Sequence, residues 1–373
     1  MRRLTYCTNI HPGESWADAR ANLEGHLLEV KSRVSPNDPF PIGLRLSGQA
    51  VAEIDDTEAK RFADWCAAGG AYVLTVNAFP HGRFHGVAVK EKVYEPDWRD
   101  PVRADYTIAV ADRLVEWLPA GAPGSISTVP VAWAPFFEEG DWGRVRDNVL
   151  RVVTHLDALA QRTGHALILA FEPEPGCVVQ TTDQAIGLFD RLALPDDLSR
   201  YAGLCYDCCH QAVQFEQPRA GFESLLAAGI PIGKVQVSSA LRACGEEIAA
   251  LPAFDEPTYL HQVVARDESG ELHRGPDLPG FFGEGGAGSK TALVEARCHF
   301  HVPIFAEAVE GCGTTRFFLE ELLPCLAPEI VLEVETYTFD VLPEALRQSS
   351  VSESIARELS WAQQRDHASN RRS

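Results

Sequence analysis

Short apolar runs alternate along the chain with longer amphipathic stretches. Eight runs are rich in β-branched and aromatic residues, as buried strands are, and they begin at residues 3, 41, 71, 124, 166, 201, 232 and 329. Most are separated by stretches with helical periodicity and charged faces, namely Trp16 to Val34, Thr57 to Gly69, Arg103 to Trp117, Trp142 to Thr163 and Thr182 to Leu192. This alternation predicts an α/β fold, a (β/α)8 TIM barrel, whose parallel strands are buried on both faces.

One long span, roughly from Leu241 to Leu323, interrupts the alternation between the seventh and eighth runs. It contains a hairpin-like sequence that turns between Asp267 and Gly270, a glycine-rich tract "PGFFGEGGAGSK" and the strand-like run "HFHVPIF". We expect one barrel domain over residues 1–345, with residues 241–323 inserted as a lid near the barrel mouth and the glycine tract mobile. Residues 346–373 are expected to form a C-terminal helix as far as Gln364, followed by a disordered tail.

Acidic and histidine side chains gather where the apolar runs end. The clearest case is "LILAFEPEPGCVV", in which a buried run leads directly into Glu172 and Glu174, two side chains that are costly to bury unpaired. The other ligand-type residues near such ends are His11, His81, His85, Asp207, His210, Gln236, Glu333 and Glu335. Because the carboxyl ends of barrel strands meet at one mouth, this pattern predicts a divalent cation held by several strands.

Strand parity indicates which acidic residues face the cation. Glu333 and Glu335 share one face of the last strand while Val334 takes the other, and we expect the two glutamates to point toward the barrel axis, with Glu335 nearer the mouth. In the fifth strand Glu172 continues the strand, whereas Pro173 begins to break it. Glu172 is therefore the better ligand, and Glu174 is expected in the loop beside the substrate.

Charge and composition narrow the choice of ligand and compartment. The 373-residue chain is 45% hydrophobic and carries 33 Lys and Arg against 53 Asp and Glu, a formal net charge of −20. Such a surface repels nucleic-acid phosphates, so we expect a small-molecule metabolite or sugar as ligand rather than nucleic acid. The N-terminal "MRRLTYCTNIHPGESW" lacks the apolar core of a signal peptide, and no uncharged apolar run reaches about 18 residues, the usual length of a membrane span. We expect a cytoplasmic protein with reduced cysteines.

Several of these motifs resemble those of a known superfamily. The "EPEPG" after the fifth strand, the D-x-x-H of Asp207 and His210, a polar residue in the seventh strand and the glutamate of the eighth are similar to the xylose isomerase-like, or sugar phosphate isomerase/epimerase, TIM barrels. More narrowly, "LTYCTNIHPGESW", "PIGLRLS", "HFHVPIF" and "LEVETYTFDVLP" resemble the EboE family, named for metabolite traffic. That resemblance spans about Leu4 to Pro343 and implies partner proteins from the same gene cluster, one that exports or processes prenylated secondary metabolites.

The superfamily resemblance implies a set of roles for particular residues. Glu172, Asp207, the residue of the seventh strand and Glu335 would bind the metal, and His210 would lie close to the substrate. The chain departs from the superfamily at Gln236, where histidine is usual, and a neutral amide oxygen is a weak ligand for zinc. Either the ion is a hard one, Mn²⁺ or Mg²⁺, or His301 takes the place of Gln236 and Zn²⁺ also suits the site. His299, at period two from His301, is expected near the substrate together with His11, His81, His85 and Glu174.

Three functions are consistent with these residues. The preferred one is an isomerase or epimerase that performs metal-assisted proton transfer on a sugar or polyol, with Glu172 and Glu335 exchanging the proton and His210 orienting a hydroxyl. The second is a barrel that binds and passes on a metabolite without turning it over. The third is a metal-dependent phosphodiesterase of the AP-endonuclease type, a branch of the same superfamily, although the acidic net charge counts against DNA as its substrate.

Overall fold

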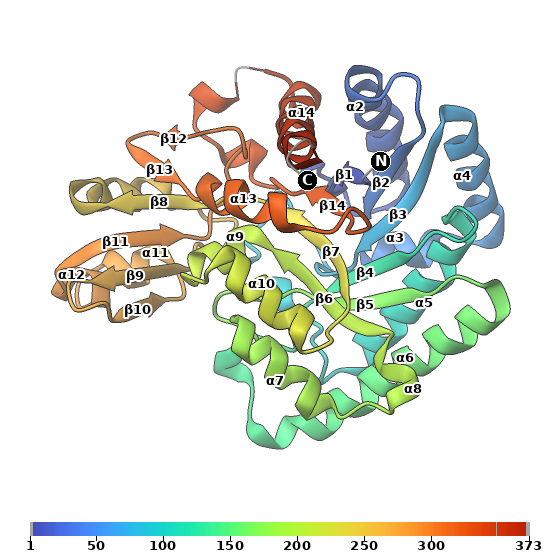
Figure 1. The fold of residues 1–373 in the computed structure, drawn as a ribbon, viewed down its shortest axis with the longest axis horizontal. Coiled ribbons are helices and arrows are strands. Elements are labelled where there is room, and N and C mark those ends of the chain that lie inside the picture. Colours follow the sequence, from blue (N-terminus) through green and yellow to red (C-terminus); the bar gives the residue numbers. More distant parts are fainter. Residues whose placement is uncertain (1–2, 348, 371–373) are drawn as a thin grey trace.

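The central feature of the protein is a barrel of eight parallel strands, seen in the computed structural model, which describes residues 3–347 and 349–370 (Figure 1). The barrel strands are β1 (Leu4–Tyr6), β2 (Phe40–Arg45), β3 (Ala71–Asn77), β4 (Gly124–Thr128), β5 (Leu167–Phe171), β6 (Ala202–Asp207), β7 (Ile232–Val237) and β14 (Leu332–Val334). They are hydrogen-bonded in the order β1-β14-β7-β6-β5-β4-β3-β2, and a parallel bridge between Cys7 and Gly43 brings β1 back to β2. The predicted (β/α)8 barrel is confirmed.

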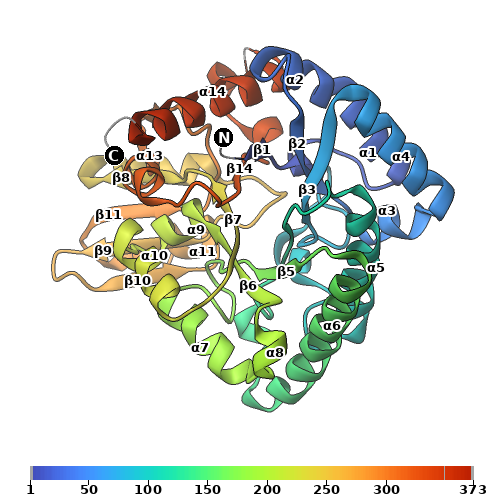
Figure 2. The ribbon, with the colours of Figure 1, turned by 45° about the vertical axis from the view of Figure 1, so that its right-hand side comes forward.

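Helices surround the barrel on its outer face (Figure 2). The longer ones are α1 (Trp16–Asn22), α2 (Leu28–Val34), α4 (Asp56–Gly69), α5 (Pro101–Trp117), α6 (Trp142–Thr163), α7 (Thr182–Leu192), α10 (Pro218–Ala227), α13 (Arg316–Leu322) and α14 (Val351–Asn370). Short helices are α3 (Gly48–Glu53), α8 (Asp196–Ser199) and α9 (Cys208–Val213). Among the described residues, no helix combines the length and apolar character that crossing a bilayer requires.

The helix ends follow from local chemistry. Ser15 accepts a hydrogen bond from the backbone of Asp18, whose carboxylate in turn accepts from the backbone of Ser15, and this capping box starts α1. Thr181 caps α7 in the same way through the backbone amide of Gln184. The predicted helix over residues 16–34 is continuous, with a π-helical turn at Leu23–Leu27 between α1 and α2.

The C-terminal helix belongs to the barrel core. Ile355 and Leu359 of α14 are buried in the same hydrophobic cluster as the barrel strands, and α14 packs against α2. The helix continues past Gln364 to Asn370, so the expectation of disorder from residue 365 is wrong as far as residue 370, and residues 371–373 lie outside the described part of the chain. Burial of the apolar face of α14 against the barrel explains why the helix persists.

The insertion between β7 and β14 forms a second, antiparallel sheet with its own hydrophobic cluster, at one side of the barrel (Figures 1 and 2). Its strands are β8 (Leu241–Cys244), β9 (Val263–Asp267), β10 (Leu272–Gly275), β11 (Leu293–Cys298), β12 (Ala308–Val309) and β13 (Cys312–Thr314). The predicted hairpin is the β9–β10 pair. The glycine tract holds two short helices, α11 (Leu278–Phe282) and α12 (Ala287–Lys290), and its mobility stays a prediction.

The run "HFHVPIF" is not a strand, contrary to the sequence-based expectation. β11 ends at Cys298, and residues 299–303 cross from the second sheet to the barrel mouth as irregular chain. The alternation has another cause, because Phe300, Val302 and Ile304 are buried in hydrophobic clusters while His299 and His301 turn toward the barrel mouth. Pro303 has no backbone donor, which also disfavours continued pairing in the sheet.

Candidate metal centre

Three buried carboxylates meet at the mouth of the barrel. Glu172 follows β5, Asp207 ends β6 and Glu335 follows β14, and one oxygen from each lies within 4.8 Å of the other two. Their residues are at most 4% exposed to solvent. Ligands of one divalent ion lie about 2.0–2.6 Å from it, so their spacing matches a single cation. The carboxyl ends of parallel strands bring together residues that are far apart in the sequence, as the strand-end pattern predicted.

Polar atoms without partners mark the same place. The buried atoms Glu172 Oε2, Asp207 Oδ2 and His301 Nε2 have no hydrogen-bond partner among the described residues, and neither do the two amide atoms of Gln236. Gln236 lies level with Asp207 on the neighbouring strand. An unsatisfied buried polar group costs about 1–3 kcal/mol, so a ligand that gave partners to these clustered atoms would stabilise the fold. These residues fit a divalent cation held by Glu172, Asp207 and Glu335, with His301 and Gln236 beside them.

Neighbouring groups fix the orientation of these ligands. The Nδ1–H of His301 donates to the backbone oxygen of Glu335 at 2.9 Å, which leaves the lone pair of His301 on Nε2 for a metal. Asp207 Oδ1 accepts from the backbone of His210 at 2.8 Å and from Ser238 Oγ at 2.9 Å, which leaves Oδ2 available. The chain therefore presents ligand atoms whose outer partners are already in place.

Two asparagines hold the third carboxylate. Glu335 Oε1 accepts hydrogen bonds from Asn9 Nδ2 at 2.8 Å and from Asn77 Nδ2 at 3.2 Å. Sequence reasoning missed both asparagines. They follow the same rule as the carboxylates, since Asn77 ends β3 and Asn9 follows β1, so the strand-end pattern could have found them if amides had been counted.

The electrostatics of the site also favour a cation. Burial, and then the charge of Asp207, raise the pKa of Glu172 to about 7. Burial and the nearby Glu172 raise the pKa of Glu335 well above its usual range, whereas burial lowers the pKa of His301 to about 4. Without a counterion these carboxylates resist being charged together, and a bound divalent ion reverses that preference.

We expect the affinity for Mn²⁺ to depend strongly on pH between pH 6 and 8. A ligand carboxylate must lose its proton before it binds, and in the metal-free protein the pKa of Glu172 is about 7. Affinity should therefore fall at least about tenfold per pH unit below pH 7, with proton release on binding from Glu172 and also from Glu335, whose pKa is raised, while His301 is already neutral there. Calorimetric Mn²⁺ titrations at pH 6, 7 and 8 measure this, and an affinity that does not change with pH would contradict it.

A second group of ligand-type residues lies next to the carboxylates. Glu174, His210 and His299 each offer an atom within 4.8 Å of the others. His210 Nδ1 lies 2.9 Å from the backbone oxygen of Pro173, and its Nε2 lies 3.1 Å from His299 Nε2. Burial alone would lower the pKa of His210, but Asp207 and Glu174 outweigh burial and raise it, whereas burial and His210 lower the pKa of His299. The shared proton therefore belongs to His210, which donates to His299.

A cysteine also enters this neighbourhood. Cys209 offers its sulfur within 4.8 Å of ligand atoms of His299 and His301. In the sequence Cys209 stands in the run "CYDCC", but no second cysteine pair stands at zinc-finger spacing, so the sequence by itself does not indicate a zinc site there. The histidines that approach Cys209 come from the insertion, far along the chain.

The other glutamate of the last strand lies in a deeper layer. Glu333 Oε1 accepts from Lys234 Nζ at 2.6 Å, both side chains are fully buried, and Thr75 donates to the other carboxylate oxygen. Glu333 is packed so closely that a Cβ on Gly43 would lie 2.3 Å from Glu333 Oε2. Both glutamates thus point into the barrel, but Glu333 is neutralised by a lysine, whereas Glu335 has no cationic hydrogen-bond partner in the described chain.

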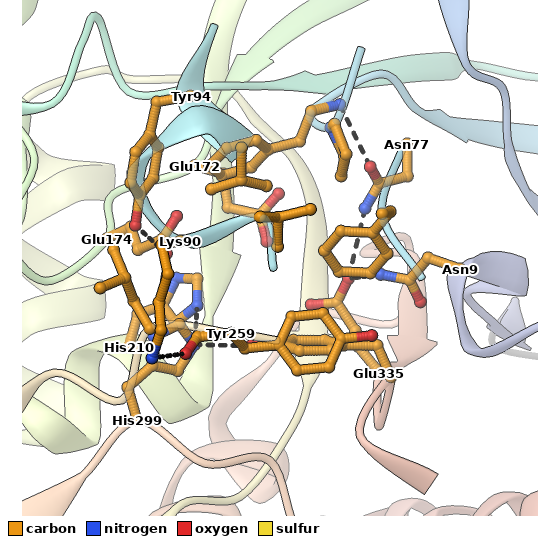
Figure 3. Close-up of a pocket in the computed structure, with 17 residues that line it drawn as sticks. Asn9, Asn77, Lys90, Tyr94, Glu172, Glu174, His210, Tyr259, His299 and Glu335 are labelled. Carbon is orange, nitrogen blue, oxygen red and sulfur yellow. Dashed lines mark hydrogen bonds and ion pairs between the residues drawn. The ribbon is translucent and has the colours of Figure 1, made fainter. Parts of the chain in front are cut away.

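A pocket opens above the carboxylates (Figure 3). Its lining includes Glu172, Glu174, His210, His299 and Glu335, so five of the residues expected at the site face one cavity. The wall above them comes from the loop after β3, from residues 259–260 before β9 and from Tyr337 after β14. Tyr259, Leu260 and His299 bring the insertion to this pocket, whereas residues of the glycine tract do not line it, and the role of the insertion as a lid stays a prediction.

Three histidines expected near the substrate lie outside this lining. His11 is buried against Tyr6 and stacks on His26, and His81 packs edge-on against Tyr106. His85 Nε2 donates to the backbone oxygen of Asn9 at 2.6 Å, and its Nδ1 accepts from the Tyr259 hydroxyl at 2.9 Å. The structure brings none of the three into the pocket, although His85 supports two residues, Asn9 and Tyr259, that do line it.

Solved structures of low sequence identity share this fold. A xylose isomerase-like TIM-barrel protein from Mycobacterium smegmatis, solved in complex with magnesium, is 12% identical with a TM-score of 0.55 over 99% of this chain and 98% of that one. L-ribulose 3-epimerase is 13% identical with a TM-score of 0.53, over 100% of this chain and 97% of that one. D-psicose 3-epimerase from Clostridium cellulolyticum H10, solved with D-tagatose, is 11% identical with a TM-score of 0.52 over 99% of both chains.

These likenesses define the fold class. The chain has the xylose isomerase-like TIM-barrel fold over nearly its whole length. No protein-family model and no curated protein matches the chain. The narrower resemblance to the EboE family therefore stays a prediction.

Proposed function

We propose that this chain is a metal-dependent isomerase or epimerase that moves a proton on a small hydroxylated carbonyl compound. The observation that carries the proposal is the cluster of three buried carboxylates, Glu172, Asp207 and Glu335, together with the unpartnered Nε2 of His301. A non-catalytic binding barrel has no need of opposed carboxylates that resist being charged together, whereas proton transfer uses them.

The residues divide the chemistry among them. A divalent cation, when bound, would polarise the carbonyl and hydroxyl oxygens of the substrate. Glu172 Oε2, which no protein group occupies, accepts the proton from the reacting carbon. Glu335, held by Asn9 and Asn77, follows β14, which is separated from β5 by the two strands β7 and β6, and it returns a proton from the other side.

His210 orients the substrate in this proposal. Its ring lines the pocket, and its Nδ1–H donates to the backbone oxygen of Pro173. Its Nε2–H donates to His299 and would turn to a hydroxyl of the substrate when one is bound. Asp207, beneath His210, stays a metal ligand and accepts from the His210 backbone. Asp207 and His210 thus couple the position of the substrate to the position of the ion.

Proteins with the same fold support the proposed isomerase or epimerase function by analogy. L-ribulose 3-epimerase and D-psicose 3-epimerase, by their names, act on sugars, and they share the fold at low identity. We further propose, from the motifs that resemble the EboE family, that the compound belongs to secondary-metabolite processing or traffic and that proteins of the same gene cluster are partners.

Hydrogen exchange at the substrate tests the proposal. The Mn²⁺-loaded protein should wash deuterium from heavy water into candidate ketoses or cluster metabolites, as followed by mass spectrometry. Glu172→Gln should abolish the exchange while binding at saturating Mn²⁺ stays within about tenfold, because glutamine keeps the shape of the side chain but cannot take the proton. Exposed Glu329→Gln is the control and should exchange normally. Binding without exchange across the whole panel would refute the enzyme and favour the metabolite-binding alternative.

A further inference from the structure

The pocket above the carboxylates has an apolar wall. It is built by Phe84, Val89, Val93, Tyr259, Leu260 and Tyr337, which we call the apolar wall. Phe84, Val89 and Tyr259 form a small hydrophobic cluster of their own, separate from the barrel core, against which Val93 and Tyr337 pack. The rings of Phe84, Tyr259 and Tyr337 lie 5.1–5.2 Å from one another. This surface faces the site rather than the barrel core, so it is available to a ligand.

The polar atoms beside this wall are already engaged within the protein. The Tyr259 hydroxyl bonds to His85 Nδ1 at 2.9 Å, and the Tyr337 hydroxyl lies 3.4 Å from His299 Nε2. Lys90, which also lines the pocket, donates to the backbone oxygen of Tyr259 at 2.7 Å and to Asp277 at 2.8 Å. Each tyrosine hydroxyl already has a partner for its one proton and Lys90 is bound within the protein, so these groups offer few donors to the hydroxyls of a ligand.

The floor of the pocket is different. Glu172 and Asn9 line the pocket, and each has a buried side-chain oxygen, Oε2 of Glu172 and Oδ1 of Asn9, without a partner among the described residues. In Figure 3 Asn9 and Asn77 lie on one side of the cavity and Lys90 and Tyr94 on the other. A hydroxyl placed against the wall would lose bonds to water that the carbon atoms of the wall do not replace, whereas a hydrocarbon group placed there would gain from leaving water.

We propose that the substrate of this site is a hydroxy-carbonyl compound that carries a hydrocarbon substituent, alkyl or aryl, on the side away from the metal-binding oxygens. The oxygens of such a compound face Glu172, Asp207 and Glu335, and the substituent contacts the apolar wall. This inference rests on the proposed function for the location of the oxygens. It differs from that proposal in excluding free, fully hydroxylated sugars as the preferred ligands.

A homologous series of ligands tests the inference directly. The Mn²⁺-loaded full chain is titrated calorimetrically with 1-hydroxy-2-propanone, 1-hydroxy-2-butanone, 1-hydroxy-2-pentanone and 1-hydroxy-2-hexanone. Affinity should rise by about fourfold per added methylene, the gain for a CH₂ that leaves water. Erythrulose, which has the carbon count of 1-hydroxy-2-butanone with two further hydroxyls, should bind at least tenfold more weakly than that ketone.

A matched pair of variants links the gain to the wall. Leu260→Asn should flatten the dependence on chain length and leave the affinity for Mn²⁺ unchanged, because Leu260 lies outside the carboxylate cluster. Leu226→Asn, at a leucine of α10 that is 50% exposed, should keep the full dependence. An affinity that stays flat or falls along the series, tighter binding of erythrulose, or absence of binding throughout would overturn the inference.

The same measurements separate this inference from the proposed function. If the series binds with rising affinity but no compound exchanges hydrogen with heavy water, the substrate class stands and the catalytic proposal fails. If erythrulose or other ketoses exchange hydrogen and bind more tightly than the alkyl ketones, the catalytic proposal stands and the inference about the substituent fails.

Discussion

Glu335→Gln is expected to lose at least about 100-fold in affinity for Mn²⁺, more than the loss of a group that only supports a ligand. The change removes one of three carboxylates that converge on the site, while the amide oxygen can still accept from Asn9 and Asn77. The local hydrogen bonds should therefore survive, and the loss should reflect charge. Calorimetric titration and the metal content of protein purified without chelator measure the effect.

Without metal, Glu335→Gln should have the opposite effect and stabilise the protein against thermal unfolding. The pKa of Glu335 is raised well above its usual range in the fold, chiefly by burial, so near neutral pH the folded protein pays for a carboxylate that the unfolded chain ionises freely. This penalty is absent at low pH and grows as pH rises past the unfolded pKa. Glutamine removes it, so without metal the variant should melt higher than the parent near pH 7, and with Mn²⁺ it should melt lower. Glu329→Gln, on the surface, should change neither. Full metal content together with unchanged stabilisation by Mn²⁺ would show that the site is elsewhere.

Lys234→Met is expected to destabilise the protein by about 3–5 kcal/mol, because it leaves Glu333 buried without its cation. Burial alone would lower the pKa of Lys234, but Glu333 outweighs burial and raises it, so the lysine is charged in the folded protein. Urea unfolding of the metal-free protein measures the loss.

Two further variants decide the cause of that loss. The double variant Lys234→Met with Glu333→Met should recover a large part of the stability, since no unpaired charge remains, and exposed Lys60→Met should stay near the parent. If the double variant is as unstable as Lys234→Met alone, the loss comes from packing in the barrel interior and not from the unpaired carboxylate.

Much of the barrel could be predicted because its signals are local. Seven of the eight barrel strands fall within the runs identified by hydrophobic pattern, β2 begins one residue before its run, and α6 and α7 have the predicted ends. Glu172, Asp207 and Glu335 could be placed together because a single rule, the meeting of strand ends, converts three distant positions into one site.

The upper part of the pocket could not be predicted in this way. Phe84, Tyr259 and Tyr337 lie in loops without periodicity, and their contacts with one another depend on the path of the insertion. His11 and His81 were predicted near the substrate because they follow strands, as the ligands do. Each packs instead into a local aromatic contact away from the pocket. Position along a strand does not determine which way a loop residue turns.

The second sheet bears on how this protein could be re-engineered. His299 and His301 belong to the chain that leaves β11, and Tyr259 precedes β9, so the insertion supplies both a metal-site residue and part of the pocket wall. Inserted segments in barrels are often treated as exchangeable modules, to be trimmed or transplanted to alter selectivity while the catalytic core is kept. Here the insertion places His301 beside the three barrel carboxylates and adds Tyr259 and Leu260 to the apolar wall, so trimming it would alter ligand recognition and the surroundings of the metal site together.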